Sequence, residues 1–350
     1  MSESLNRFRE KLSELVLNFV LEQWAAVGVM ATRAPEQARV IDPEPLLLLT
    51  LEVARHDPRT FDEVLDWLMT NGRWINVARL SALFDADRIC APEVLGAVAA
   101  TLSGHDKTPK WRKLAARLKP LQDKSAEALF RKNGQPLFLL GSEPDATFIS
   151  YGLLRTPVET RGLSSPVFSS PASEWSAANF MFKARALFGV SIRADVFSFI
   201  VLQGASNPTR IARELGYSQR RVQDALLDMT SAGLFQVRNI GNAKEYFADS
   251  ERVLRFLGAL DEGICWFDWR PESRALSTVW RRAFAMREEN LTAYILESEQ
   301  EKILREVEND LLRAIPKRAV ITHAGADLLP GKPHGLMEKL QRTLSPLIRR

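Results

Sequence analysis

One stretch of this sequence, residues 193–248, restricts the fold more than any other. After an apolar segment, Asn207 is suited to cap a short helix and Pro208 to begin it, because the N–H that proline lacks would be unpaired there. Gly216 fits the left-handed residue that ends a helix, and a second helix with apolar residues at helical spacing follows it. On both sides of residues 239–242, apolar and polar residues alternate, which predicts a β-hairpin. The stretch therefore predicts three helices and a hairpin, in that order.

The second of the two short helices has one buried stripe and one exposed face. Four apolar residues recur at helical spacing and define the buried stripe: Val222, Ala225, Leu226 and Met229. On the opposite side, Arg220 could donate two hydrogen bonds to a guanine and Gln223 could pair with the edge of an adenine. Asp224 and Asp228 would repel phosphate, and Leu227 is unusually apolar for a residue that faces a DNA groove. The exposed face is therefore mixed in character.

In the order of its elements, this stretch resembles the winged helix-turn-helix transcriptional regulators of the ArsR and MarR kind. The resemblance implies a protein that binds duplex DNA, usually as a homodimer. The residues expected to contact DNA lie on the two short helices and the hairpin: Arg210, Arg213, Ser218, Gln219, Arg220, Arg221, Gln223, Arg238, Asn242 and Lys244. Arg220 and Gln223 would read bases, while most of the others would meet phosphates, which position a protein without reading sequence. Metal sensing of the ArsR kind is not expected, because the chain lacks clustered Cys or His.

The charge distribution also favours a nucleic-acid partner for this part of the chain. The 350-residue sequence has a net charge of +4, and residues 182–248 carry nine basic and five acidic residues. The excess of the whole chain therefore equals the excess of this segment. A phosphate-binding surface needs such local positive charge, whatever the balance elsewhere.

Composition argues against a secreted or membrane protein. The two cysteines, Cys90 and Cys265, are far apart in the sequence and are interpreted as small apolar residues rather than a disulfide or metal site. No apolar run approaches the length of a membrane span, and the N-terminus is polar. We therefore expect a protein of the reduced cytoplasm with no membrane partner.

Residues 1–120 are predicted to be helical throughout. Apolar residues recur at helical spacing in five segments: 5–30, 45–55, 60–70, 75–84 and 92–102. Thr60 is expected to cap the third segment, because Glu63 three residues later completes a capping box. The middle three segments could form a second, degenerate helix-turn-helix that offers Asn76, Arg79 and Ser81. The alternative is a plain helical bundle used for packing or dimerisation.

A basic segment, residues 107–119, ends this helical region and surrounds Trp111. Its cations could meet phosphate while the indole stacks on a base. Alternatively, the cations form a solvated helix face and Trp111 packs inward. The sequence leaves both interpretations open.

The rest of the chain is divided at changes in composition. Residues 121–173 are predicted to hold short strands at 136–140 and 147–153, followed by a Pro- and Ser-rich linker. Residues 174–250 would hold the winged unit, and residues 251–350 a helical C-terminal region. The predicted fold class is therefore mainly α, with one short β-hairpin in the central unit.

Two features of the C-terminal region could serve contacts with other chains. The aromatic cluster from Trp266 to Trp280 is typical of a core or of an oligomer contact. The long helix predicted at 290–315 could dimerise or pack on its own domain, and both alternatives give the same apolar face.

No motif in the sequence indicates an enzyme. The four histidines stand in no metal-ligand spacing with each other or with cysteine. A phosphate-cradling glycine loop and a nucleophile elbow are also missing, so we expect neither a cofactor nor a metal. The sequence predicts a DNA-binding transcriptional regulator. The alternative is a non-catalytic scaffold whose winged unit, aromatic cluster or N-terminal helices dock a partner protein.

Overall fold

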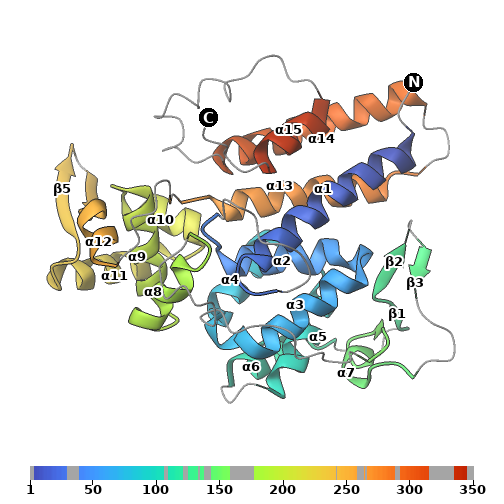
Figure 1. Ribbon diagram of the computed structural model, residues 1–350, viewed down its shortest axis with the longest axis horizontal. Coiled ribbons are helices and arrows are strands. Elements are labelled where there is room, and N and C mark those ends of the chain that lie inside the picture. The colour runs from blue at the N-terminus through green and yellow to red at the C-terminus, as the bar shows by residue number, and fades with distance from the viewer. Residues whose placement is uncertain are drawn as a thin grey trace.

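The computed structural model shows a mainly helical chain, which confirms the predicted fold class at that level. It describes residues 4–29, 39–105, 109–120, 125–132, 135–137, 143–157, 177–241, 243–257, 264, 266–287, 292–314 and 335–344. Helices from both ends of the chain gather into one body, and a smaller group of helices with a hairpin projects at one side (Figure 1).

Six α-helices account for most of the first 120 residues: α1 (Leu5–Ala25), α2 (Pro43–Val53), α3 (Pro58–Asn71), α4 (Val77–Asp87), α5 (Pro92–Ser103) and α6 (Pro109–Leu118). The predicted helices of this region are confirmed, with their ends shifted by a few residues. Short 3-10 helices follow α2 and α3: η1 (Ala54–His56) and η2 (Gly72–Trp74). The predicted cap of α3 is wrong. Asp57 caps this helix, and its carboxylate accepts hydrogen bonds from the Arg59 backbone N–H at 3.2 Å and from the Thr60 hydroxyl at 2.7 Å.

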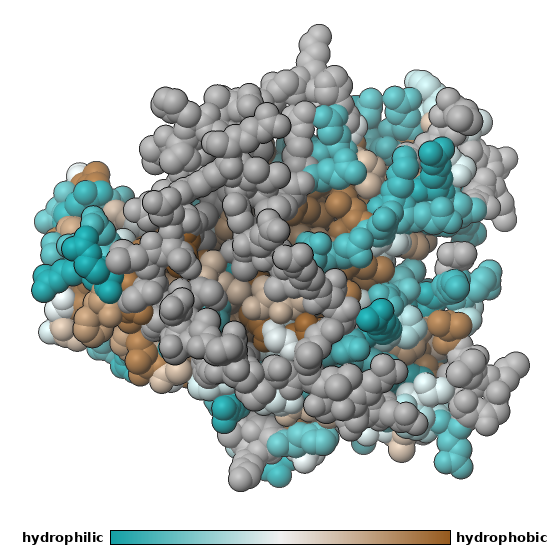
Figure 2. Space-filling model, in the orientation of Figure 1, coloured by the Kyte–Doolittle hydropathy of each residue, from teal (hydrophilic) through white to brown (hydrophobic). Residues whose placement is uncertain are grey.

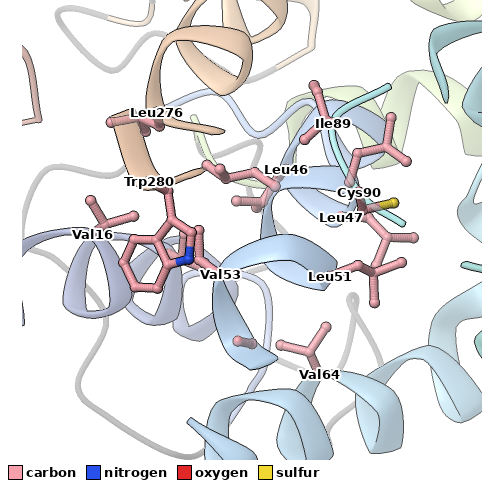
Figure 3. Packing of buried hydrophobic residues seen from close by; sticks show 14 of the residues in the cluster. Val16, Leu46, Leu47, Leu51, Val53, Val64, Ile89, Cys90, Leu276 and Trp280 are labelled. Atoms are coloured by element: carbon pink, nitrogen blue, oxygen red, sulfur yellow. The ribbon is translucent and has the colours of Figure 1, made fainter. Parts of the chain in front are cut away.

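Helix α2 lies at the centre of the larger core. Its run of four leucines has no polar face, and nearly all of its residues are buried. Side chains from neighbouring helices converge on it, among them Val16 of α1, Val64 of α3 and Trp280 of α13 (Trp269–Ala285), as Figure 3 shows. Cys90 is buried in the same cluster, as the sequence predicted. A run of apolar residues that covers every side of a helix is stable only when it is buried in this way.

Two small sheets involve residues 127–154. β1 (Glu127–Ala128) pairs in parallel with β4 (Leu153–Leu154), and β2 (Phe130–Lys132) pairs antiparallel with β3 (Gln135–Leu137). The strand predicted at 147–153 is wrong except at its last residue, because Leu153 belongs to β4. Asp145 accepts hydrogen bonds from the backbone N–H groups of Thr147 and Phe148, and it thereby begins a helical turn, α7 (Ala146–Ile149). Of the other predicted strand, Pro136 and Leu137 lie in β3, as predicted. Its residues 138–140 and most of the predicted linker lie outside the described residues.

The predicted central unit contains the expected succession of elements: α8 (Phe180–Phe188), α9 (Ile192–Gln203), α10 (Pro208–Leu215), α11 (Gln219–Ser231), β5 (Gln236–Ile240) and β6 (Ala243–Phe247). The two strands pair antiparallel, with Gln236 opposite Phe247 and Ile240 opposite Ala243. Helix α12 (Ser250–Phe256) follows them. We call residues 191–248, from the start of α9 to the end of the hairpin, the hairpin module.

The C-terminal region is helical, with α13, α14 (Ala293–Ala314) and α15 (Gly335–Leu344). Its aromatic cluster is buried: Trp266, Trp269 and Trp280 are each at most 2% exposed. The core interpretation of this cluster is therefore confirmed, and it offers no surface to another chain. The apolar face of α14 is also buried within the chain, through Ile303, Val307 and other residues, where α14 contacts α13 and α15.

Buried apolar side chains form two clusters. The larger joins the N-terminal helices to α13, α14 and α15, so both ends of the chain share one core. The smaller lies within α8 to α11 and the hairpin, and it also includes Val40 and Trp266. The sequence boundaries between domains stay a prediction. At the end of the molecule that holds the hairpin module, Figure 2 shows hydrophilic and apolar side chains side by side. Within the described residues, no helix has both the length and the apolar character needed to cross a membrane.

Candidate nucleic-acid interface

A groove of about 630 Å³ lies on the hairpin module, where both short helices begin beside the hairpin. Residues of α10, α11 and β6 line it: Asn207, Pro208, Thr209, Arg210, Arg213, Gln219, Gln223, Ala243 and Lys244. Five of these nine residues were predicted to contact DNA. Three of them are cations, and no carboxylate of the described residues lines the groove. The groove is therefore a positively charged channel suited to an anion.

Local sequence signals build the walls of this groove. Asn207 caps α10 as predicted, because its side chain accepts a hydrogen bond from the Arg210 backbone N–H at 2.9 Å. Gly216 ends α10 with φ +73°. Any side chain there would also collide with Leu83 of α4, so the position requires glycine. The first turn of α10 and the first residue of α11 both face the groove, and helix N-termini carry partial positive charge.

Long-range contacts hold the hairpin against the helices. Ser206, just before α10, and Tyr246 of β6 exchange two backbone hydrogen bonds of 3.0 and 2.8 Å. Gln223 of α11 donates from its side-chain amide to the Tyr246 hydroxyl at 2.7 Å. The predicted role of Gln223 as an adenine reader therefore needs correction. Its amide is engaged within the chain, and it joins α11 to β6 at the wall of the groove.

Ion pairing inside the module leaves an excess of positive charge on its surface. Four of the five carboxylates of residues 191–248 pair with an arginine: Asp195 with Arg185, Glu214 with Arg213, Asp228 with Arg193, and Glu245 with Arg238. Four cations of the module have no carboxylate within 4 Å in the described part of the chain: Arg210, Arg220, Arg221 and Lys244. Asp224 is the remaining carboxylate. The repulsion expected from Asp228 is thus offset by Arg193, a contact that the sequence analysis did not find.

The exposed face of α11 keeps its mixed character. Arg220, Asp224 and Leu227 are exposed, and the Leu227 side chain is 49% exposed. The guanidinium of Arg221 lies over the ring of Tyr217, 5.7 Å from its centroid. Ser218 takes the predicted cap position of α11, but its side chain makes no capping hydrogen bond.

The hairpin supplies fewer residues to the groove than predicted. Arg238 lies against its own hairpin, where it pairs with Glu245 at 3.0 Å and sits over the ring of Phe247. Lys244 faces the groove, and Asn242 lies outside the described residues. Arg213 lines the groove but also pairs with Glu214 at 2.6 Å. Arg210, Gln219 and Lys244 are therefore the groove residues whose polar ends are most available to a ligand.

Four groove residues were not predicted to bind a ligand, and two of them have polar side chains. Asn207 and Thr209 belong to the start of α10, which the sequence analysis interpreted only as a helix cap. The same Asn-Pro-Thr sequence indicates a helix N-terminus, and such an N-terminus is a common place for phosphate contacts.

The two other nucleic-acid surfaces considered in the sequence are not formed. Trp111 is 1% exposed and packs into the larger core, so its indole cannot stack on a base. Asn76 and Arg79 are 8% and 1% exposed, so the helix predicted at 75–84 presents no reading face with them. The plain helical bundle is therefore the better interpretation of the N-terminal helices.

Beside the groove, Asp268 and Glu214 are two carboxylates close to its arginines. Asp268 precedes α13 and accepts a hydrogen bond from Trp266 Nε1 at 2.8 Å. Burial and the nearby Glu214 carboxylate together raise the pKa of Asp268 to about 6, although the hydrogen bond from Trp266 and the charge of Arg210 lower it.

A pH dependence of stability follows from this carboxylate. The pKa of Asp268 is about 6 in the folded chain and roughly 3.9 in an unfolded chain. Its contribution to stability is therefore present at low pH and lost as the pH rises through 6. Between about pH 5 and pH 7, the free energy of unfolding should fall less in Asp268→Asn than in the wild type. Urea unfolding at each of the two pH values measures it. Asp249→Asn, at the exposed cap of α12, is the matched control. Equal pH dependence in all three proteins would contradict the assignment.

Other chemistry finds little support among the described residues. His, Cys, Asp and Glu side chains there form no group of three that could hold a metal ion. Burial raises the pKa of the Cys90 thiol, which keeps it protonated and unreactive.

The chain was also compared with known proteins. No protein-family model matches it, and no curated protein or solved structure is significantly similar to it. A functional assignment therefore depends on the groove and the charges around it.

Proposed function

We propose that the hairpin module is a winged helix-turn-helix that binds duplex DNA, and that the chain is a transcriptional regulator of the cytoplasm. The groove carries this proposal. It brings Arg210, Arg213 and Lys244 from two elements to one channel without a carboxylate among its described lining residues. Amide side chains and the Thr209 hydroxyl complete a lining that could donate hydrogen bonds to phosphate oxygens.

In the proposed complex, α11 is the recognition helix. Its N-terminal residues Gln219, Arg220 and Arg221 are exposed and would enter the major groove. The hairpin would be the wing, and the sugar–phosphate backbone between the two would follow the channel past Arg210 and Lys244. Phosphate contacts in the channel would set the register of the helix on the duplex, and Arg220 would read a base edge.

We further propose that the protein acts as a homodimer on a two-fold symmetric site, as most helix-turn-helix regulators do. The apolar face of α14 would not supply this interface, because its residues are already buried against α13 and α15. Exposed apolar residues at the start of α14, Tyr294 at 80% and Ile295 at 41%, remain available.

A scaffold that docks a protein through the same module is the second candidate. One observation favours it: apolar side chains are exposed on α11 and β5, with Leu227 at 49%, Val237 at 46% and Ile240 at 51%. Exposed apolar side chains on neighbouring elements are a feature that a docked protein could cover. Replacing Leu227 and Ile240 by serine would weaken such docking and leave salt-dependent DNA affinity intact.

The proposal is tested by the double variant Arg220→Ala with Arg221→Ala. Its affinity for a duplex selected from a genomic library should fall at least roughly 10-fold, and the salt slope should flatten by about one phosphate contact, because Arg221 would meet phosphate whereas Arg220 would read a base edge. Fluorescence anisotropy at several salt concentrations measures both quantities.

The matched control for this variant is Arg112→Ala with Lys113→Ala. These two adjacent cations are exposed on α6, far from the module in the sequence, and their removal changes the net charge equally. The control should bind like the wild type. If both double variants lose affinity equally, the effect is one of net charge, and α11 is not the recognition helix.

A further inference from the structure

Behind α11, charged side chains and a tyrosine form one buried hydrogen-bonded network. Its members come from five parts of the chain: Asp42 and Glu44 at the start of α2, Arg79 on α4, Arg185 on α8, Asp195 on α9, and Tyr217 between α10 and α11. The side chains of the five charged residues are at most 2% exposed. Charges buried to this extent are tolerated only when they are paired.

The two arginines join the N-terminal helices to the hairpin module. Arg79 donates to Asp42 at 2.5 and 2.6 Å and to Glu44 at 2.7 Å. Arg185 donates to Glu44 at 2.7 and 2.8 Å and to Asp195 at 2.9 Å. The network thus runs without a break from α2 and α4 to α9.

Three carboxylates share only two guanidinium groups, so one of them is less well compensated. Burial raises the pKa of Asp42 to about 6, because Arg79 and the more distant Arg185 do not fully compensate for the lost hydration. Burial also raises the pKa of Glu44, but Arg185 and Arg79 outweigh it and hold that pKa below its usual range.

Tyr217 connects this network to the turn that begins α11. Its hydroxyl donates to Asp195 Oδ2 at 2.6 Å and accepts from Asn76 Nδ2 at 2.8 Å. Arg79 Nε donates to the Leu215 carbonyl at 2.7 Å, two residues earlier. Residues of α4 and its cap therefore hydrogen-bond to the turn at two points, the Tyr217 side chain and the Leu215 backbone carbonyl.

A second clamp acts on the same turn from α13. Arg270 donates to the Arg213 carbonyl at 2.7 Å and pairs with Asp87 of α4 at 2.7 Å. The end of α10 is thus held by both α4 and α13. These contacts are directional hydrogen bonds, which restrict orientation more than apolar packing does.

The ring of Tyr217 also contacts one residue proposed to meet DNA, Arg221. The guanidinium of Arg79 lies 5.8 Å from the ring centroid and that of Arg221 lies 5.7 Å from it. One aromatic ring therefore contacts both a buried cation of the helical body and an exposed cation of α11.

We infer that Tyr217 is a positioning residue, which fixes the direction of α11 relative to the helical body. The N-terminal helices then support the hairpin module rigidly, rather than forming a second domain joined to it by a linker. The consequence for DNA rests on the proposed function. Hydrogen bonds to base edges require that the position and direction of the recognition helix are fixed, whereas contacts to phosphates tolerate a helix that has shifted. Tyr217 would therefore govern discrimination between sites more than overall attraction to DNA.

The test uses Tyr217→Phe, which keeps the aromatic ring and removes both hydrogen bonds of the hydroxyl. Tyr294→Phe is the matched control, because Tyr294 is 80% exposed on α14. Asn76→Ser is a second variant that keeps an oxygen at the cap of α4 and removes the bond to Tyr217.

Two measurements are made on full-length wild type and variants. The first is amide hydrogen exchange, by mass spectrometry, of peptides that cover residues 212–221. The second is the ratio of affinities for a selected and an unrelated duplex, with the salt slope of each. In Tyr217→Phe and Asn76→Ser we expect faster exchange in 212–221 and a ratio roughly 10-fold smaller, with the salt slopes unchanged. Tyr294→Phe should match the wild type.

Each contrary outcome identifies what fails. Unchanged exchange in 212–221 in both variants overturns the positioning role of Tyr217, whatever happens with DNA. Faster exchange with an unchanged ratio, or with equal losses for both duplexes, overturns its role in discrimination. If the wild type binds no duplex, the proposed function fails, and the exchange measurement still decides whether Tyr217 sets the position of α11.

Discussion

Replacing Arg79 by methionine is expected to lower the free energy of unfolding by about 3–5 kcal/mol. The substitution leaves Asp42 without its two hydrogen bonds from Arg79, while Glu44 keeps only Arg185 and the Asn76 backbone N–H. A buried carboxylate without its partner is much less stable than one in water. Urea unfolding at neutral pH, followed by tryptophan fluorescence, measures the loss.

The same variant should lose less stability in acid. In the wild type, burial raises the pKa of Asp42 to about 6 although Arg79 lowers it, and the loss of Arg79 raises this pKa further. In mild acid Asp42 of the variant is therefore protonated and no longer needs a cationic partner. Arg220→Met is the control, because Arg220 is exposed and has no carboxylate partner among the described residues. The control should change stability by less than roughly 0.5 kcal/mol. A similarly small loss in Arg79→Met would show that the network does not hold the N-terminal helices to the module.

The double variant Arg210→Gln with Lys244→Gln is expected to weaken duplex binding roughly 10- to 100-fold near physiological salt. Both residues line the groove, and neither pairs with a carboxylate of the described chain. Glutamine keeps a long polar side chain and removes only the charge. The salt slope should decrease by about two units, because each lost phosphate contact removes about 0.9.

Arg112→Gln with Lys113→Gln on α6 controls for the groove variant, since it removes the same two kinds of cation elsewhere. It should bind DNA like the wild type. Equal weakening by both double variants would mean that attraction is spread over the whole surface and that the groove is not the binding site.

The elements of the hairpin module could be predicted because their signals are local. Asn207 and Pro208 begin α10, and Gly216 ends it. The apolar stripe of α11 lies within eleven residues of Ser218, the residue at the cap position of that helix. Each of these features acts through the backbone within a few residues, so the sequence alone carries it. The prediction of a strand at α7 failed because its local signal was ambiguous. A short apolar run fits strand and helix equally, and the cap at Asp145 decided for the helix.

The site could be predicted only in part, because pairing partners lie far apart in the sequence. Gln223 bonds to Tyr246, and Arg193 pairs with Asp228, across 23 and 35 residues. No periodicity or spacing indicates such pairs. As a result, the face of α11 was expected to hold one more unpaired carboxylate and one more free amide than it does.

The buried network was missed for the same physical reason. Arg185 meets Glu44 across 141 residues, and Asn76 meets Tyr217 across the same separation. Asn76 and Arg79 were considered as surface readers of nucleic acid, since an arginine in a helix is usually exposed. Charged residues inside otherwise apolar segments, such as Glu44 beside four leucines and Asp195 in α9, were the available signals of buried ion pairs.

The salt dependence of duplex binding by the wild-type protein tests the central claim most directly. A mixed-sequence duplex should be titrated from about 0.05 to 0.3 M salt, and log affinity plotted against log salt. Four cations of the module lack a carboxylate partner among the described residues, Arg210, Arg220, Arg221 and Lys244, and they predict a slope of about −3 to −4 per chain. A slope near zero, or no measurable affinity at the lowest salt, would contradict the proposal that this module binds DNA.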